Sequence, residues 1–86
     1  MHFIVELYLS STGSDDLEQI AARARRGAEQ LAREGAAIRH LRSTHVPGDE
    51  MCLLIYQAPN RELVLEAARR SGLAFERCVE AIEAVS

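Results

Sequence analysis

The strongest constraint on the fold is that two segments of the chain are apolar at both odd and even positions. Residues 3–9 and 51–56 are hydrophobic almost throughout. In a β-strand, successive side chains point to opposite faces of the sheet, so each segment needs cover on both faces. The two amphipathic helices that the sequence predicts can cover one face. The other face therefore requires a second chain or a ligand.

Composition restricts the class of protein. The 86 residues predict one domain over residues 1–86, near the lower size at which a core alone gives comfortable stability. With 48% hydrophobic and 27% charged residues, the chain is typical of globular proteins, and its net charge of −3 argues against broad nucleic-acid binding. Apolar runs are too short to cross a membrane, and the start lacks the features of a signal peptide. We expect a cytoplasmic protein with neither a nucleic-acid nor a membrane partner.

Local patterns predict the element order β-α-β-β-α-β. Ser14 is the expected cap of a first helix that stops at Gly35, and Asn60 is the expected cap of a second helix that stops at Gly72. Gly27 lies inside the first helix and is expected there only if close packing requires it. The predicted strands are residues 2–9, 37–46, 50–58 and 76–85, with a hairpin turn at 47–49.

This order predicts an α+β ferredoxin-like fold, a four-stranded antiparallel sheet with both helices on one face. The first and third strands are then central, which suits their two-sided apolar character. Strand one would separate Cys52 from Cys78 by two inter-strand spacings, roughly 9–10 Å. That distance exceeds the reach of a disulfide, so both thiols are expected to be free.

Several stretches resemble a family of small bacterial proteins, long labelled a domain of unknown function and since associated with nickel binding. The stretches are Glu6, residues 41–43, residues 56–59, residues 67–73 and residues 77–80. The resemblance implies a ferredoxin-like dimer of the α+β barrel type, with two sheets packed face to face. It also implies nickel as a ligand.

The faces of the strands decide which side chains meet. With Phe3 and Val5 toward the helices and a three-residue turn at 47–49, His40 pairs with Tyr56, Arg42 with Leu54 and Thr44 with Cys52. If Val79 and Ala81 lie in the core, one open face collects the remaining side chains. They are Ile4, Glu6, Tyr8, His40, Arg42, Cys52, Leu54, Tyr56, Cys78, Glu80 and Ile82. A turn of two or four residues would bring Leu41, Ser43 and His45 to that face instead.

Such a face would line an enclosed cavity in a dimer and form the default ligand site. Its expected ligand-binding residues are Glu6, Arg42, Tyr56 and Glu80, and its expected metal ligands are His40, His45, Glu6 and Cys52. Imidazole, thiolate and carboxylate together suit nickel or zinc. No CxxC or HxxxH spacing supports the metal, however, and each glutamate could simply be exposed or paired with Arg42 or Arg77. His2, beside the N-terminal amine, offers an adventitious chelate.

Three functions stay open at this point. The first is a homodimeric binding protein that takes nickel, another divalent transition metal or a small ligand between its sheets. The second is a cofactor-independent enzyme of the dimeric α+β barrel kind, with Glu6, His40 or Tyr56 transferring protons. The third is a regulatory or structural module without a ligand. Six arginines on the two helices are interpreted as a solvated face whose charge is offset by nearby acids. They are Arg23, Arg25, Arg26, Arg33, Arg69 and Arg70.

Overall fold

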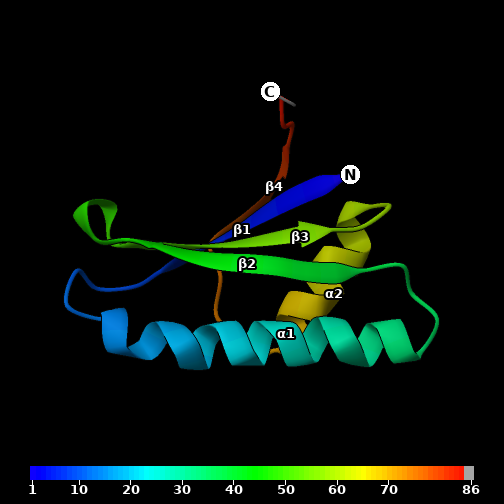
Figure 1. Cartoon of the computed structure of the whole chain (residues 1–86), viewed down its shortest axis with the longest axis horizontal. Coiled ribbons are helices and arrows are strands. Elements are labelled where there is room, and N and C mark those ends of the chain that lie inside the picture. Colours follow the sequence, from blue (N-terminus) through cyan, green and yellow to red (C-terminus); the bar gives the residue numbers. More distant parts are fainter. Residues whose placement is uncertain (85–86) are drawn as a thin grey trace.

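The computed structural model describes residues 1–84 and confirms the predicted order of strands and helices (Figure 1). The strands form one antiparallel sheet in the order β2-β3-β1-β4, with β1 and β3 central. The last strand is shorter than the predicted 76–85, and residue 85 lies outside the described part. The elements are β1 (His2–Tyr8), η1 (Ser14–Asp16), α1 (Leu17–Arg33), β2 (Arg39–Val46), η2 (Pro47–Asp49), β3 (Met51–Gln57), α2 (Arg61–Arg70) and β4 (Arg77–Ala81).

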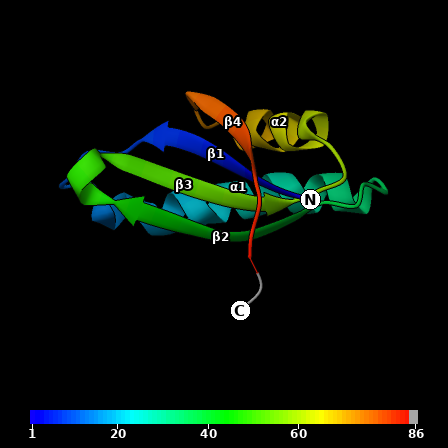
Figure 2. The same ribbon diagram turned by 90° about the horizontal axis from the view of Figure 1, so that it is seen from above.

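Both helices lie on one face of the sheet, and the core fills the space between these layers (Figures 1 and 2). Alternate side chains of the two central strands meet small and branched side chains of the helices there. The central members are Phe3, Val5, Leu7, Cys52, Leu54, Tyr56, Ala24, Ala28, Leu31, Val64, Ala67 and Ala68. Within residues 1–84, no helix has both the length and the apolarity that a membrane crossing needs.

The register corrects the predicted faces of the third and fourth strands. Phe3 faces Tyr56 across β1 and β3, and Val5 faces Leu54 on one side and Cys78 on the other. Directly opposed residues share a face, so Tyr56, Leu54 and Cys78 point toward the helices with Phe3 and Val5. The same pairing places Cys52 in the core opposite Leu7 and puts Glu80 opposite Phe3, on the helix side of the edge strand. Placing these side chains on the open face was wrong. Ile82, expected on the open face, follows the end of β4 and is fully exposed.

Strand β2 differs from the prediction because it contains a bulge and because the connection that follows it is one residue longer than expected. His40 pairs with Tyr56 as predicted, but Arg42 pairs with Ile55, and a register shift lies between His40 and Arg42. Four residues connect Val46 to its partner Met51, and the last of them, Glu50, is left-handed with φ 52°. Consequently Thr44 pairs with Leu53 rather than Cys52, and His45 faces Cys52. The connection has the four residues of the alternative turn, but Ser43 and His45 lie on the helix side with Leu54 and Cys52, not on the open face as that alternative expected.

The two expected helix caps have different outcomes. The Asn60 side chain accepts a hydrogen bond from the Leu63 amide at 3.0 Å and caps α2 as predicted. Ser14 does not cap α1, because the chain enters through the 3-10 turn η1 and the Ser14 hydroxyl bonds to His45 instead. Gly35 and Gly72 follow the helices with φ of 102° and 68°, which is the left-handed conformation expected at these stops.

Candidate functional site

The face of the sheet opposite the helices, called the open face below, carries apolar side chains that no helix covers. Ile4, Leu53 and Val79 are half-buried on its central part, and Tyr8 is 59% exposed at its edge. The cross-strand pairs Ile4–Ile55, Glu6–Leu53 and Tyr8–Met51 define this face on the two central strands. Its centre is therefore a partly solvated apolar surface with a small number of polar groups.

One polar group on the open face is the ion pair of Glu6 with Arg77. Glu6 Oε2 lies 3.0 Å from Arg77 Nε, and the two residues are cross-strand partners on β1 and β4. The Glu6 side chain is only 18% exposed. Hydrogen bonding to Glu6 raises the pKa of Arg77, so the carboxylate is already held by a cation.

A second polar group is centred on Glu83, in the segment that follows β4. Glu83 Oε1 lies 3.8 Å from His2 Nε2 and 3.9 Å from Arg42 Nη2. His2 belongs to β1 and Arg42 to the edge strand β2, with β3 between them. The segment after β4 therefore passes over the open face, as Figure 2 shows.

The predicted metal ligand His40 lies on the other side of the sheet. Its Nε2 is hydrogen-bonded to Ser43 Oγ at 2.9 Å, and its ring packs edge-on against Tyr56 with centroids 5.4 Å apart. Burial, and secondarily the charge of Arg25, lowers the pKa of His40. The neutral imidazole is favoured, and its partners give it a packing role.

His45 and Cys52 are cross-strand neighbours on the helix side of the sheet. His45 Nδ1 lies 3.0 Å from Ser14 Oγ, while its Nε2 is buried and has no hydrogen-bond partner among the described residues. Cys52 is fully buried, and burial raises the pKa of its thiol. This pair offers an imidazole next to a thiol that resists ionisation.

The remaining predicted residues are separated from one another. Tyr56 is fully buried, its hydroxyl has no partner among residues 1–84, and burial raises the pKa of the phenol. Glu80 is exposed on the edge strand, whereas Glu6 and Arg42 lie on the open face. The structure thus brings Glu6 and Arg42 to one face but does not bring them together with Tyr56, His40 or Cys52.

Within residues 1–84, no three His, Cys, Asp or Glu side chains stand close enough to hold a metal ion. On the open face, His2 and Glu83 form a pair of potential metal ligands, with Nε2 and Oε1 3.8 Å apart. Sequence reasoning did not single out Glu83. The last strand was predicted to continue to residue 85, whereas β4 ends at Ala81 and the residues after it cross the open face. The apolar character of the open face was the available signal that the site would lie there.

Comparison with known proteins gives a family match and a structural match. A family model described as "Nickel responsive protein SCO4226-like" matches residues 3–81. The crystal structure of SCO4226 from Streptomyces coelicolor A3(2) superposes with a TM-score of 0.71 at 16% identity, covering 99% of this chain and 100% of that one. At that identity the likeness bears on the fold. A search of curated proteins returned no significant match.

Proposed function

Because the chain belongs to the SCO4226-like family of nickel-responsive proteins, we propose that it is a homodimer that binds nickel between two open faces. Family membership supports nickel as the ligand, and the open face of this chain supports the position that we propose for it. The observation that carries the proposal is the apolar open face, which bears an imidazole beside a carboxylate at 3.8 Å.

The open face suits a second copy of the chain. Its half-buried centre includes Ile4, Leu53 and Val79, and Tyr8 extends the apolar surface to the end of β1. Contiguous apolar surface of this kind marks an interaction site in small proteins. Twofold packing would bury the same patch on both chains and would enlarge the core of an 86-residue protein.

The His2–Glu83 pair suits half of a nickel site. Imidazole nitrogen and carboxylate oxygen are both ligands for divalent transition metals. A twofold axis near Glu83 would place two imidazoles and two carboxylates around one point, which a single chain does not achieve. The His45–Cys52 pair lies under the helices, so packing of open faces cannot double it. Glu6 would have to leave Arg77 before it could bind a metal.

The dimer is tested by light scattering on the wild type and on Leu53→Glu. Placing a charge in the centre of the apolar interface should shift the protein of 9.5 kDa from dimer toward monomer. Ala32→Glu adds the same charge at an exposed position of α1 and should leave the dimer intact. A wild type that is monomeric at micromolar concentration contradicts the proposal.

The metal site is tested by calorimetry and native mass spectrometry with nickel. His2→Ala and Glu83→Gln should each weaken nickel binding by about tenfold or more, and the wild-type affinity should fall from about pH 8 to about pH 5.5 as imidazole is protonated. His45→Ala should bind nickel as the wild type does. Loss of binding in His45→Ala alone would move the site to the His45–Cys52 pair and overturn the open-face assignment.

A further inference from the structure

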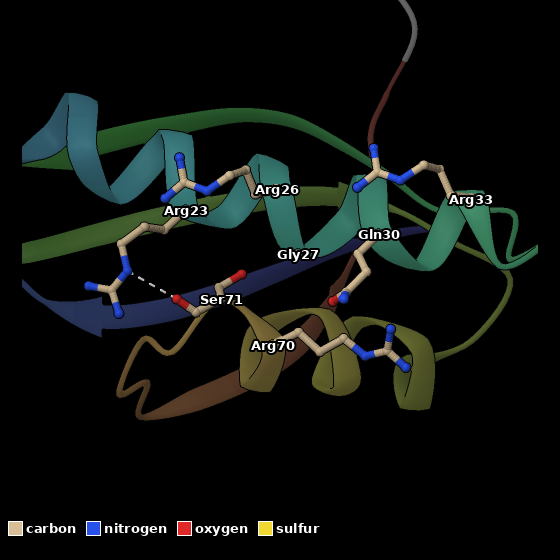
Figure 3. Close-up of a pocket in the computed structure, with 7 residues that line it drawn as sticks. All are labelled: Arg23, Arg26, Gly27, Gln30, Arg33, Arg70 and Ser71. Atoms are coloured by element: carbon tan, nitrogen blue, oxygen red, sulfur yellow. Dashed lines mark hydrogen bonds between the residues drawn. The ribbon is translucent and has the colours of Figure 1, made fainter.

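A second concave site lies between α1 and α2, on the side of the helices away from the sheet. Figure 3 shows this groove, which encloses about 300 Å³. That volume is at the lower end of small-molecule sites. Four arginines and one amide surround a floor of small side chains. The lining residues are Arg23, Arg26, Gly27, Gln30, Arg33, Arg70 and Ser71, and none of these is acidic.

The groove exists because the helices approach most closely at Gly27. A Cβ on Gly27 would lie 2.5 Å from both the Ala67 carbonyl oxygen and Ser71 Oγ. The floor is therefore backbone and a single hydroxyl, while the longer side chains of α1 and α2 form walls around it. In Figure 3 the Gln30 amide points into the gap, and Arg26 and Arg33 lie along the α1 rim.

Three of the four arginines carry charge that no carboxylate of residues 1–84 balances. Arg70 is paired with Glu34 at 2.6 Å and with Glu66 at 2.9 Å. In contrast, the ion pairs of the described residues include none for Arg23, Arg26 or Arg33. Acids thus hold Arg69 and Arg70 of α2 directly, whereas Arg23, Arg26 and Arg33 of α1 have no such contact among the described residues. This concentration of positive charge occurs in a chain whose net charge is −3.

Arg23 caps the C-terminal end of α2 beside the groove. The C-terminal end of α2 presents carbonyl oxygens and the negative end of the helix dipole. Arg23 Nε donates to the backbone carbonyl oxygen of Ser71 at 3.0 Å, and Arg23 Nη2 donates to the backbone carbonyl oxygen of Gly72 at 2.7 Å. Both acceptors are uncharged backbone carbonyls. The hydrogen bonds therefore leave the positive charge of the Arg23 guanidinium unneutralised beside the groove.

We propose that this groove binds a small phosphate-bearing anion, with Arg26 and Arg33 as its charge partners and Gln30 as a hydrogen-bond donor. Guanidinium groups match the geometry of phosphate oxygens and hold their charge at every physiological pH. The groove admits a phosphate group and a small attached body. The site is independent of the nickel proposal, because it lies on the face of the molecule opposite to the open face.

The test uses inorganic phosphate and glycerol phosphate as separate probes, with amide chemical shifts as the readout. Both probes should shift the Gly27 and Ser71 amides, and tighter binding of glycerol phosphate would identify a phosphorylated metabolite rather than the free ion. The double variant Arg26→Gln, Arg33→Gln should bind at least about tenfold more weakly, since each guanidinium contact is charge-assisted.

The control is Arg25→Gln, a neighbouring arginine of α1 that is exposed and lies outside the groove. It should leave phosphate affinity unchanged. Equal weakening by Arg25→Gln would show diffuse attraction rather than a site and would overturn the proposal. Absence of shifts at Gly27 and Ser71 would also overturn it, as would a short single-stranded RNA that binds while neither small phosphate does.

Discussion

Gly27 of α1 touches the backbone of α2 at Ala67, where a Cβ on the glycine would lie 2.5 Å from the carbonyl oxygen. Contacts this short do not occur at real Cβ atoms, so an alanine requires the helices to separate. The same atom would also lie 2.5 Å from Ser71 Oγ. The close approach explains why a residue of low helix propensity occupies the middle of a 17-residue helix.

Gly27→Ala should therefore destabilise the protein although alanine is the better helix former. The propensity gain of about 1 kcal/mol is outweighed by an overpacking cost of about 1–3 kcal/mol, giving a net loss of up to about 2 kcal/mol in urea unfolding. Gly48→Ala is the matched control, because a Cβ there meets nothing within 4 Å. It should change the free energy of unfolding by less than about 0.5 kcal/mol. A Gly27→Ala protein more stable than the wild type would show that the helices separate easily.

Element order was predictable from the sequence because each helix and strand has its own local signals. The Asn60 cap, the stops at Gly35 and Gly72 and the apolar run around Val5 all act within a few residues of chain. The separation of Cys52 from Cys78 by β1 followed from that order alone, and both thiols are free.

The faces of β3 and β4 were not predictable in the same way. Residues 51–56 are apolar on both faces, so their pattern does not reveal which set meets the helices. The answer depends on the register of Phe3 against Tyr56, a contact between residues far apart in the chain. The predicted site was wrong for the same reason. Exchanging the two faces of β3 moves Tyr56 and Cys52 from the open face to the core.

The two predicted caps provide a paired test of helix starts. Asn60→Ala should cost about 1 kcal/mol in the free energy of unfolding, because the Leu63 amide loses its acceptor. Ser14→Ala should cost less than about 0.5 kcal/mol, since its hydroxyl caps no helix and contacts His45 at an exposed position. Equal losses in the two variants, measured by urea unfolding, would contradict the assignment of Ser14 outside the cap.

The buried hydroxyl of Tyr56 should contribute nothing to stability. It has no hydrogen-bond partner among the described residues, so Tyr56→Phe removes an unsatisfied polar group and keeps the ring. We expect a free energy of unfolding equal to that of the wild type or up to about 1 kcal/mol higher. Tyr56→Ala, in contrast, should lose about 3–5 kcal/mol through the cavity it leaves. A loss above about 1 kcal/mol in Tyr56→Phe would reveal a partner for the hydroxyl, either a bound water or the Ser71 side chain, whose hydrogen bonding opposes the rise in the Tyr56 pKa.

His40 should make the protein less stable in mild acid. Burial, with a smaller effect from Arg25, lowers the pKa of His40 below its usual 6.5, whereas a hydrogen bond at Arg42 opposes this only in part. The unfolded chain therefore binds a proton more readily than the native one. The neutral ring contributes its full stability above about pH 6.5, and this contribution is lost as the pH falls from there through the folded-state pKa.

The measurement is the free energy of urea unfolding at about pH 7.5 and about pH 5.5. The wild type should lose more stability over this interval than His40→Gln, even if the variant is less stable at both pH values because it lacks the contact with the Tyr56 ring. If His40→Gln loses as much stability as the wild type between the two pH values, the acid sensitivity does not arise from His40.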